Sequence, residues 1–266
     1  MKIITMGTLK GGAGKTINLF NIAGILAETH RVLLIDIDPQ CNLSFDCGVD
    51  ITNRDTLTVR DIFNNTPKNQ PSAKKVIMKG IIKELPNLDI IPSSILLFET
   101  ERRVFNVGNR EHILENFIKN NIDELDEYDY IMIDTNPSMS LVNINAFYVA
   151  DEIIISSDMS TNSVNGAELF CQLWDEHREE LLKEDNISAL IISNYDKRTK
   201  LGKELIKHTK QAEFSRDLVL DSIVPSTVKM KDCEIQHKPV NILYKNEEIC
   251  LIYKKVVKEL FDREVL

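Results

Sequence analysis

Residues 10–16, Lys-Gly-Gly-Ala-Gly-Lys-Thr, combine a glycine turn with two lysines and a hydroxyl side chain. Glycines let the backbone curl so that its N–H groups point at an anion, and a following helix N-terminus adds partial positive charge. Lys15 and Thr16 fit the end of the phosphate-loop pattern G-x-x-x-x-G-K-[ST], but Leu9 stands where that pattern begins with glycine. A second lysine, Lys10, opens the loop instead. The residues expected to surround a bound nucleotide are Lys10, Gly11, Gly12, Ala13, Gly14, Lys15, Thr16 and Ile17.

Two carboxylates, Asp36 and Asp38, follow an apolar run and precede Pro39. Because they are two residues apart, both side chains lean to one side of an extended backbone. A carboxylate near a γ-phosphate can order magnesium-bound water or orient the water that attacks. Taken alone, the segment is better interpreted as a polar strand end that enters a turn, and only the phosphate loop reverses that balance.

A third candidate is Asp134, which ends the apolar run 130–134. An apolar strand that ends in aspartate has the form of the element whose carboxylate reaches magnesium through water. Any strand can end in aspartate, so this signal is weak by itself. Together, the three segments predict a phosphate site at Lys15, with magnesium near Thr16 and Asp134 and further carboxylates close by.

Alternating strands and helices must position these residues. Residues 2–6 form a short apolar run before the loop, and residues 17–28 carry apolar side chains at helical spacing after it. The alternation continues along the chain, which favours a single-domain, doubly wound α/β fold of the P-loop NTPase type, a mainly parallel sheet with helices on both faces. Residues 64–75 are rich in Asn, Pro, Lys and Ser and predict a surface loop. Further strands are expected at 32–37, 88–91, 130–134, 153–156, 189–192 and 220–224.

Composition narrows the function classes. The 266 residues with 43% hydrophobic content can fill the core of one domain over 1–266, and no apolar run of about 18 residues suggests a membrane span. The first strand starts at once, so we expect neither a secretion signal nor an added N-terminal DNA-reading domain. Five scattered cysteines without close pairs favour free thiols in a reducing cytoplasm. A net charge of −9 disfavours a generally basic nucleic-acid binder but allows a local basic patch.

Five ordered segments resemble the ParA/MinD family of deviant-Walker ATPases, and within it the ParA/Soj partition branch. The resemblance covers nearly the whole chain and is weakest between residues 50 and 127. In the third segment, Asn136 replaces the first of two prolines that the family carries. The segments are 10–16 (K-G-G-x-G-K-T), 31–43 (R-V-L-L-[IV]-D-x-D-P-Q-x-N), 128–138 (Y-D-Y-[IV]-[IV]-I-D-x-P-P-S), 193–199 (T-M-Y-D-x-R-T) and 224–240 (I-P-R-N-V-R…G-K-P-[IV]).

The resemblance implies specific roles, with ATP and Mg²⁺ as ligands. Lys10 occupies the position of the signature lysine, which in this family crosses a dimer interface toward the partner's nucleotide. Asp38 occupies the position associated with activating the hydrolytic water, so the implied catalytic residues are Lys10, Lys15 and Asp38. Asp36 and Asp134 would support magnesium. Asn194 and Pro225 lie in segments that surround the adenine base.

The resemblance also implies partners. ATP-bound homodimers of the partition branch bind DNA without sequence preference through basic side chains, here Arg198, Lys229 and Lys231. Ser226 stands where many members have arginine, so the basic patch differs from theirs. A ParB-like centromere-binding protein would stimulate hydrolysis, and the protein would be cytoplasmic and nucleoid-associated. Whether the cargo is a plasmid, a chromosome or a conjugative element stays open.

Three other readings compete. A MinD-like ATPase recruited to a membrane would need a basic amphipathic helix beyond the domain. Residues 249–261 have helical apolar spacing, but they coincide with the family's terminal packing helix, so we expect no membrane partner. An iron–sulfur reductase would need a cysteine soon after the 130–134 strand, and none lies between Cys47 and Cys171. A metabolic P-loop enzyme that uses ATP stays open from the loop alone, although the segments at 195 and 225 argue against it.

Overall fold

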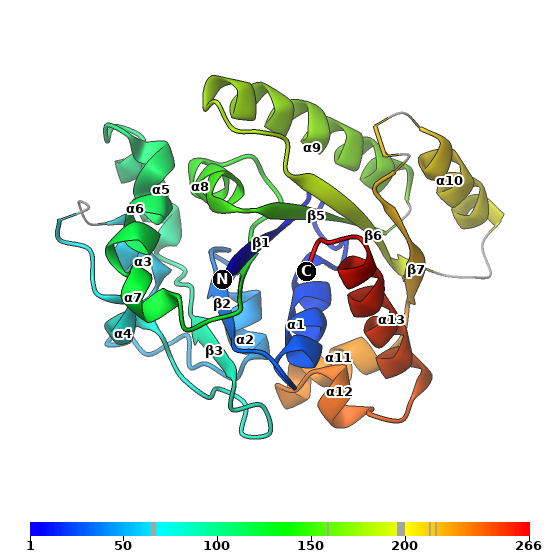
Figure 1. Cartoon of the computed structure of the whole chain (residues 1–266), viewed down its shortest axis with the longest axis horizontal. Coiled ribbons are helices and arrows are strands. Elements are labelled where there is room, and N and C mark those ends of the chain that lie inside the picture. Colours follow the sequence, from blue (N-terminus) through cyan, green and yellow to red (C-terminus); the bar gives the residue numbers. More distant parts are fainter. Residues whose placement is uncertain (65–67, 159, 196–199, 213, 216) are drawn as a thin grey trace.

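One parallel sheet organises the chain. The computed structural model describes residues 1–64, 68–158, 160–195, 200–212, 214–215 and 217–266. The strands in these ranges are β1 (Lys2–Gly7), β2 (Val32–Asp36), β3 (Leu88–Ile91), β4 (Tyr130–Asp134), β5 (Glu152–Ser157), β6 (Ile187–Tyr195) and β7 (Val219–Pro225). They pair in parallel in the order β3-β2-β4-β1-β5-β6-β7 (Figure 1). The doubly wound parallel sheet predicted from the sequence is confirmed, and each predicted strand agrees with an observed one to within a few residues.

Helices cover both faces of the sheet (Figure 1). One face carries α1 (Lys15–Leu26), α2 (Asn42–Asp46), α11 (Lys229–Gln236), α12 (Val240–Leu243) and α13 (Glu248–Asp262). The other carries α3 (Val59–Phe63), α4 (Ala73–Val76), α5 (Leu97–Val104), the 3₁₀ turn η1 (Arg110–His112), α6 (Ile113–Asn120), α7 (Ile122–Leu125), α8 (Leu141–Val149), α9 (Thr161–Glu180) and α10 (Lys200–Gln211).

The central strands are buried on both faces, which explains their unbroken apolar runs. In β1, Ile4 packs into the core beneath α1 and α13, whereas Ile3 packs into the core beneath α6 and α8. In β2, Leu34 packs into the same core as Ile4, and Leu33 packs into the same core as Ile3. This alternation is the two-residue period of a strand, so successive side chains fill the two cores in turn.

Two local expectations need correction. The sequence placed the first helix at 17–28, but α1 spans Lys15–Leu26 because the glycine turn ends at Gly14, which caps the helix. Lys15 and Thr16 therefore belong to the first helical turn and not to the loop. The expected surface loop at 64–75 ends early because α4 begins at Ala73, and residues 65–67 of that loop lie outside the described residues.

All strands in the described ranges run in one direction, so the segments that follow them meet at one edge of the sheet. Adjacent strands place Asp36 directly beside Asp134, and Met6 of β1 also lies beside Asp134. In open α/β sheets, ligands bind at this carboxyl edge. Within the described ranges, no helix is both long and apolar enough to span a lipid bilayer.

Candidate functional site

A cavity of about 750 Å³ opens at the carboxyl edge of the sheet. Its volume is in the range of small-molecule and cofactor sites. The walls combine the glycine loop with the ends of β2, β6 and β7 and with the helices α2 and α11. Of the residues predicted from the sequence, those that line it are Lys10, Gly11, Gly12, Ala13, Gly14, Lys15, Thr16, Ile17, Asp38, Asn194, Pro225 and Lys231.

The glycine loop has a backbone that only glycine adopts without strain at two positions. Gly12 and Gly14 have φ values of 80° and 79°, in the left-handed region. Gly14 is also crowded, because a Cβ there would lie 2.5 Å from Ser193 Oγ. A Cβ on Gly12 would meet nothing within 4 Å, so its requirement is conformational alone.

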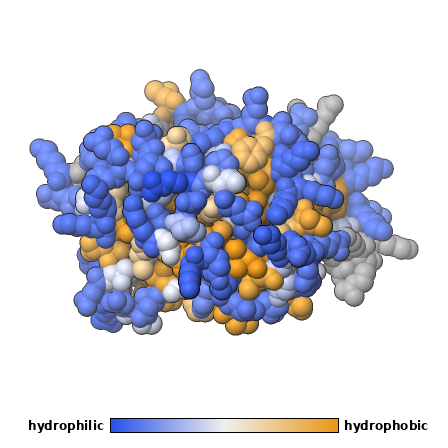
Figure 2. Space-filling view, turned by 60° about the horizontal axis from the view of Figure 1, so that its bottom comes forward, coloured by the Kyte–Doolittle hydropathy of each residue, from blue (hydrophilic) through white to orange (hydrophobic). Residues whose placement is uncertain are grey.

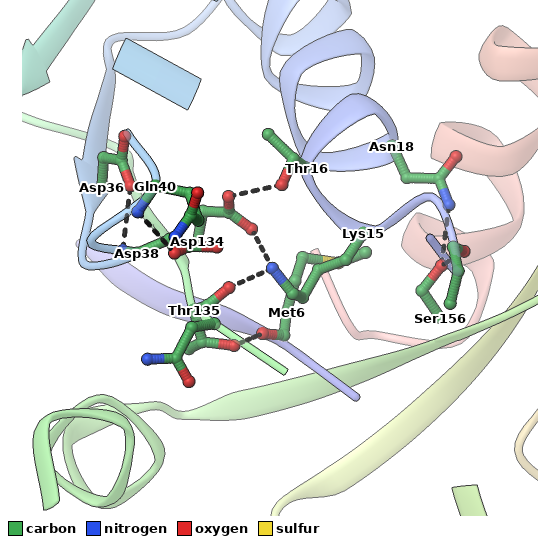
Figure 3. A network of polar contacts seen from close by, with 12 residues as sticks. Met6, Lys15, Thr16, Asn18, Asp36, Asp38, Gln40, Asp134, Thr135 and Ser156 are labelled. Atoms are coloured by element: carbon green, nitrogen blue, oxygen red, sulfur yellow. Dashed lines mark hydrogen bonds and ion pairs between the residues drawn. The ribbon is translucent and has the colours of Figure 1, made fainter. Parts of the chain in front are cut away.

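A buried polar network holds the loop from beneath, and sequence reasoning missed it. The Ala13 carbonyl accepts hydrogen bonds from Ser156 Oγ and Ser193 Oγ, each at 2.6 Å. Asn18 Nδ2 donates to Ser156 Oγ at 3.1 Å (Figure 3), and Tyr253 of α13 donates to Asn18 Oδ1 at 2.8 Å. The only signal in the sequence is a small polar residue at the end of two apolar strands. The network ties three distant segments to one carbonyl and so fixes the curl of the loop.

The Lys15 ammonium lies beneath the loop against the end of β4 (Figure 3). Its Nζ donates to Asp134 Oδ1 at 2.8 Å and also to the Thr135 carbonyl. Thr16 Oγ1 donates to Asp134 Oδ2 at 2.7 Å. The Lys15 side chain is 7% exposed and that of Asp134 is 0% exposed, so the two charges compensate each other away from water. The structure thus brings together the predicted phosphate lysine, hydroxyl and carboxylate.

Asp36 is fully buried next to Asp134, and opposing effects act on its pKa. Burial raises its pKa to about 7, and the neighbouring Asp134 carboxylate adds to the rise. Opposing this, Ser44 donates through its hydroxyl at 2.7 Å and its backbone N–H at 2.8 Å, and the Asp38 N–H donates at 3.0 Å. Two adjacent buried carboxylates repel each other when both are charged, and a bound cation would reduce that repulsion.

The donors fit Mg²⁺. Thr16, Asp36 and Asp134 offer only oxygen atoms, the ligand type that magnesium prefers, and magnesium is usually held by one or two carboxylates with phosphate and water. Over the described part of the chain, no group of three or more His, Cys, Asp or Glu could hold a metal by itself. The site therefore suits an ion that arrives with a phosphate ligand better than a permanently caged one.

Asp38 lies at the cavity wall with its side chain only 4% exposed. Its Oδ1 accepts a hydrogen bond from the Gln40 N–H at 2.8 Å, which fixes the carboxylate at the start of a turn (Figure 3). Burial raises its pKa above the ordinary aspartate value, although the Gln40 hydrogen bond and Lys15 oppose the rise. A raised pKa strengthens a carboxylate as a base, which suits a group that takes a proton from water.

Lys10 lies at the same cavity but contacts its own chain. Its Nζ donates to Asp158 Oδ2 at 2.8 Å and to Ser160 Oγ at 2.6 Å. Desolvation raises the Asp158 pKa, but hydrogen bonds from Lys10 and Ser160 outweigh it and leave that pKa below the usual aspartate value. Neither acceptor was foreseen, because they lie about 150 residues from Lys10 in the sequence.

The segments expected around the base also reach the cavity. Asn194, exposed and with φ of 52°, follows the buried part of β6, and Pro225 ends β7. An unforeseen carboxylate, Asp46 of α2, is 5% exposed at the cavity wall. Burial raises its pKa to about 8, with Glu234 of α11 the largest charged contributor.

The three expected DNA-binding residues differ in what the structure shows. Lys231 of α11 is exposed at the cavity rim. Lys229 forms an ion pair with Glu247, and its ammonium lies 5.2 Å from the centre of the Tyr244 ring. Arg198 lies outside the described residues.

Comparison with known proteins agrees with this site. A family model described as an AAA domain matches residues 1–189. An uncharacterised protein of Mycobacterium tuberculosis is 32% identical over 98% of this chain and 79% of its own length. The chromosome partitioning protein ParA of Caulobacter vibrioides is 27% identical over 99% of this chain and 95% of its own length.

Solved structures share the fold. A putative plasmid partition protein of Borrelia burgdorferi bound to AMPPNP superposes with a TM-score of 0.78 at 24% identity, covering 98% of this chain and 99% of that one. Cobyrinic acid a,c-diamide synthase of Mycobacterium smegmatis, with a bound ATP analogue and magnesium, gives 0.77 at 21% identity, covering 98% and 94%. The loop with two lysines, the full-length partition relatives and the shared fold agree, and the chain therefore belongs to the ParA/MinD family of deviant-Walker P-loop ATPases, in its ParA/Soj partition branch.

Proposed function

We propose that this chain is a DNA-segregation ATPase that dimerises when it binds ATP and then binds DNA without sequence preference. A ParB-like centromere-binding protein stimulates hydrolysis, and hydrolysis dissolves the dimer and releases the DNA. The protein then works on the nucleoid in the cytoplasm. The observation that carries the proposal is the convergence of Lys10, Lys15 and Asp38 on one cavity at the carboxyl edge of the sheet.

ATP binding follows from the contacts of Lys15. Without nucleotide, its ammonium donates hydrogen bonds to Asp134 and to the Thr135 carbonyl. A triphosphate would offer this ammonium stronger, anionic acceptors. The N–H groups of the glycine loop and the start of α1 supply further positive potential. Mg²⁺ bound with ATP would neutralise negative charge on the phosphates. Thr16, Asp36 and Asp134 are the residues that would hold it.

Hydrolysis needs a positioned water and a cation near the γ-phosphate. Asp38 is fixed by the Gln40 N–H and buried at the cavity wall, so its carboxylate can orient water and take its proton. Lys10 supplies positive charge for the transferred phosphoryl group, in the role that an arginine finger plays in other NTPases. In the dimer, this lysine acts on the partner's nucleotide.

Asn194 and Pro225 also line the cavity, and we assign them to the adenine base. Lys231, on α11, is an exposed cation that lines the same cavity, and we assign it to DNA phosphate. Lys229 must exchange Glu247 for phosphate before it contributes.

The test is DNA binding in three states, with ATP and Mg²⁺, with ADP and Mg²⁺, and without nucleotide. We expect binding only with ATP, on duplexes of unrelated sequence alike. If a dimer makes about four phosphate contacts, affinity falls on the order of a hundredfold between 50 and 200 mM salt. Fluorescence anisotropy of a labelled duplex measures this directly. Equal DNA binding in all three states would contradict the proposal that ATP controls it.

A matched pair of variants locates the DNA surface. Lys231→Ala should weaken ATP-dependent binding uniformly across sequences and lower the salt slope by about one per protomer. Lys119→Ala removes the same charge from an exposed side chain of α6 that pairs with Glu115. It should leave DNA binding unchanged.

The MinD-like alternative needs a free amphipathic helix for the membrane. In α13, most of the apolar stripe faces the core, where Ile249, Tyr253, Val256 and Leu260 are each at most 4% exposed, and Phe261 at its end is 38% exposed. Figure 2, which views the side of α11 and α12, shows apolar side chains broken up by hydrophilic ones. These features favour packing as the role of α13, as the sequence predicted.

The fold does not distinguish a partition ATPase from a metabolic ATP-using enzyme, because the diamide synthase has a similar fold. ATP-dependent DNA binding separates the two functions, since a small-molecule synthetase has no need of it. The relatives with partition names match 99% of this chain and favour the segregation function.

A further inference from the structure

In this protomer, the side chain of Lys10 is engaged before any partner arrives. Its ammonium donates to Asp158 at 2.8 Å and to Ser160 at 2.6 Å. The Lys10 side chain is 30% exposed and that of Asp158 is 18% exposed, so the ion pair is partly screened from water. A lysine that must reach another protomer is thus bound first to its own chain.

The two acceptors are fixed independently of Lys10. Ser160 caps α9, where its hydroxyl accepts from the Ser163 N–H, and its own N–H donates to Asp158 Oδ1 at 3.0 Å. The Asp158 N–H donates to Ser163 Oγ at 3.2 Å. Asp158 therefore presents one carboxylate oxygen to its own turn and the other to Lys10. Gly166 of α9 also lies beside this contact, because a Cβ there would sit 3.8 Å from Lys10 Cβ.

These contacts create a competition. A single ammonium has three donors, but it cannot stay at the start of α9 and also extend to a phosphate of the partner protomer. We propose that Asp158, with Ser160, is a positioning group that holds Lys10 against its own protomer and sets the threshold for ATP-driven dimerisation. This inference rests on the proposed function, because the role of Lys10 across the interface belongs to it.

The size of the threshold follows from the strength of the pair. If the pair lowers the fraction of protomers with a released Lys10 about fivefold, the equivalent of about 1 kcal/mol, each protomer is competent to dimerise that much less often. A symmetric dimer must release two lysines. Removing the pair should therefore lower the dimer dissociation constant by about 25-fold.

The first experiment tests the contact in the nucleotide-free protein. Asp158→Asn keeps an oxygen that can accept from the Ser160 N–H and replaces the other oxygen, the partner of Lys10, with an amide NH₂ that cannot accept. We expect severalfold faster acetylation of Lys10 by N-succinimidyl acetate, measured by peptide mass. Lys119, 66% exposed on α6, is the internal reference. An unchanged rate at Lys10 would overturn the proposal.

The second experiment tests the threshold. Sedimentation velocity with AMPPNP and Mg²⁺ should show half-dimerisation at about 25-fold lower protein concentration in Asp158→Asn than in the parental chain. The charge-preserving Asp158→Glu should return the midpoint toward the parental value. Asp175→Asn is the matched control, because it removes an equal charge from α9 where Asp175 pairs with Arg178. That control should leave the midpoint unchanged.

The outcomes separate the two claims. Suppose that the parental chain dimerises with AMPPNP and that Asp158→Asn dimerises at the same protein concentration or more weakly. This result would contradict the proposed threshold but not the proposed function. A parental chain that stays monomeric contradicts the proposed function and the threshold together, and the acetylation result then still decides whether Asp158 restrains Lys10.

Discussion

Lys15→Ala is expected to abolish nucleotide binding and also to destabilise the nucleotide-free protein. The ammonium is the one cation within hydrogen-bond distance of the buried Asp134 in the described structure, and it is also the proposed phosphate ligand. Truncating one partner of a buried charge pair costs about 2–5 kcal/mol in binding. We therefore expect a loss of ATP affinity of a hundredfold or more, on the order of 3 kcal/mol. Isothermal titration with MgATP measures it.

The loss of stability has a separate cause. Without Lys15, the fully buried Asp134 carboxylate keeps the Thr16 hydroxyl but has no compensating charge. Breaking a buried pair in this way costs about 3–5 kcal/mol. At about 2–4 °C for each kcal/mol, the midpoint of thermal unfolding falls by about 6–20 °C. Thermal unfolding without nucleotide should therefore reveal the change before any ligand is added.

An exposed lysine provides the control. Lys119→Ala removes the ion pair with Glu115 on α6, where the lysine is 66% exposed, and should leave the midpoint of thermal unfolding almost unchanged. If Lys15→Ala bound ATP as the parental chain does, the assignment of the phosphate loop would be wrong. If it unfolded at the parental temperature, Lys15 would not be compensating Asp134.

Asp38→Ala is expected to stop hydrolysis while ATP still binds. A positioned general base contributes about 10²–10⁴-fold to a rate. Asp38 is a buried cavity carboxylate with a raised pKa, and the Gln40 N–H fixes its orientation. The phosphate contacts of Lys15 and the glycine loop do not involve it. Phosphate release at saturating ATP should fall by that factor, and the ATP dimer should persist.

Asp38→Asn separates chemistry from folding. Its amide oxygen can still accept from the Gln40 N–H, so the turn is kept, but the amide cannot take a proton from water. The two variants should therefore lose the same activity. Hydrolysis at the parental rate in either one would refute the role of Asp38 in activating water.

The sequence predicted the fold well because periodicity is local. The apolar runs at 88–91 and 130–134 coincide with β3 and β4, and the parallel order follows from alternating strands and helices. The phosphate loop was equally visible because its glycines, Lys15 and Thr16 are contiguous. The start of α1 was misplaced by two residues, since a glycine turn hides where helical geometry begins.

The contacts that lie far apart in the sequence could not be predicted in this way. Ser193 donates to the Ala13 carbonyl from 180 residues away, and Asp158 accepts from Lys10 across 148 residues. A serine or an aspartate at the end of a strand gives no sign of which neighbouring loop it will meet. Only the strand order, with β5 beside β1 and β6 beside β5, brings these side chains beneath the glycine loop.

The central claim is that ATP assembles this chain into a dimer, and the mass of the parental protein in different nucleotides tests it most directly. Sedimentation velocity should be run at one protein concentration with Mg²⁺ plus AMPPNP, with Mg²⁺ plus ADP, and with Mg²⁺ alone. We predict a dimer with AMPPNP and a monomer of 30.4 kDa in the other two samples. The same mass in all three samples would contradict the account.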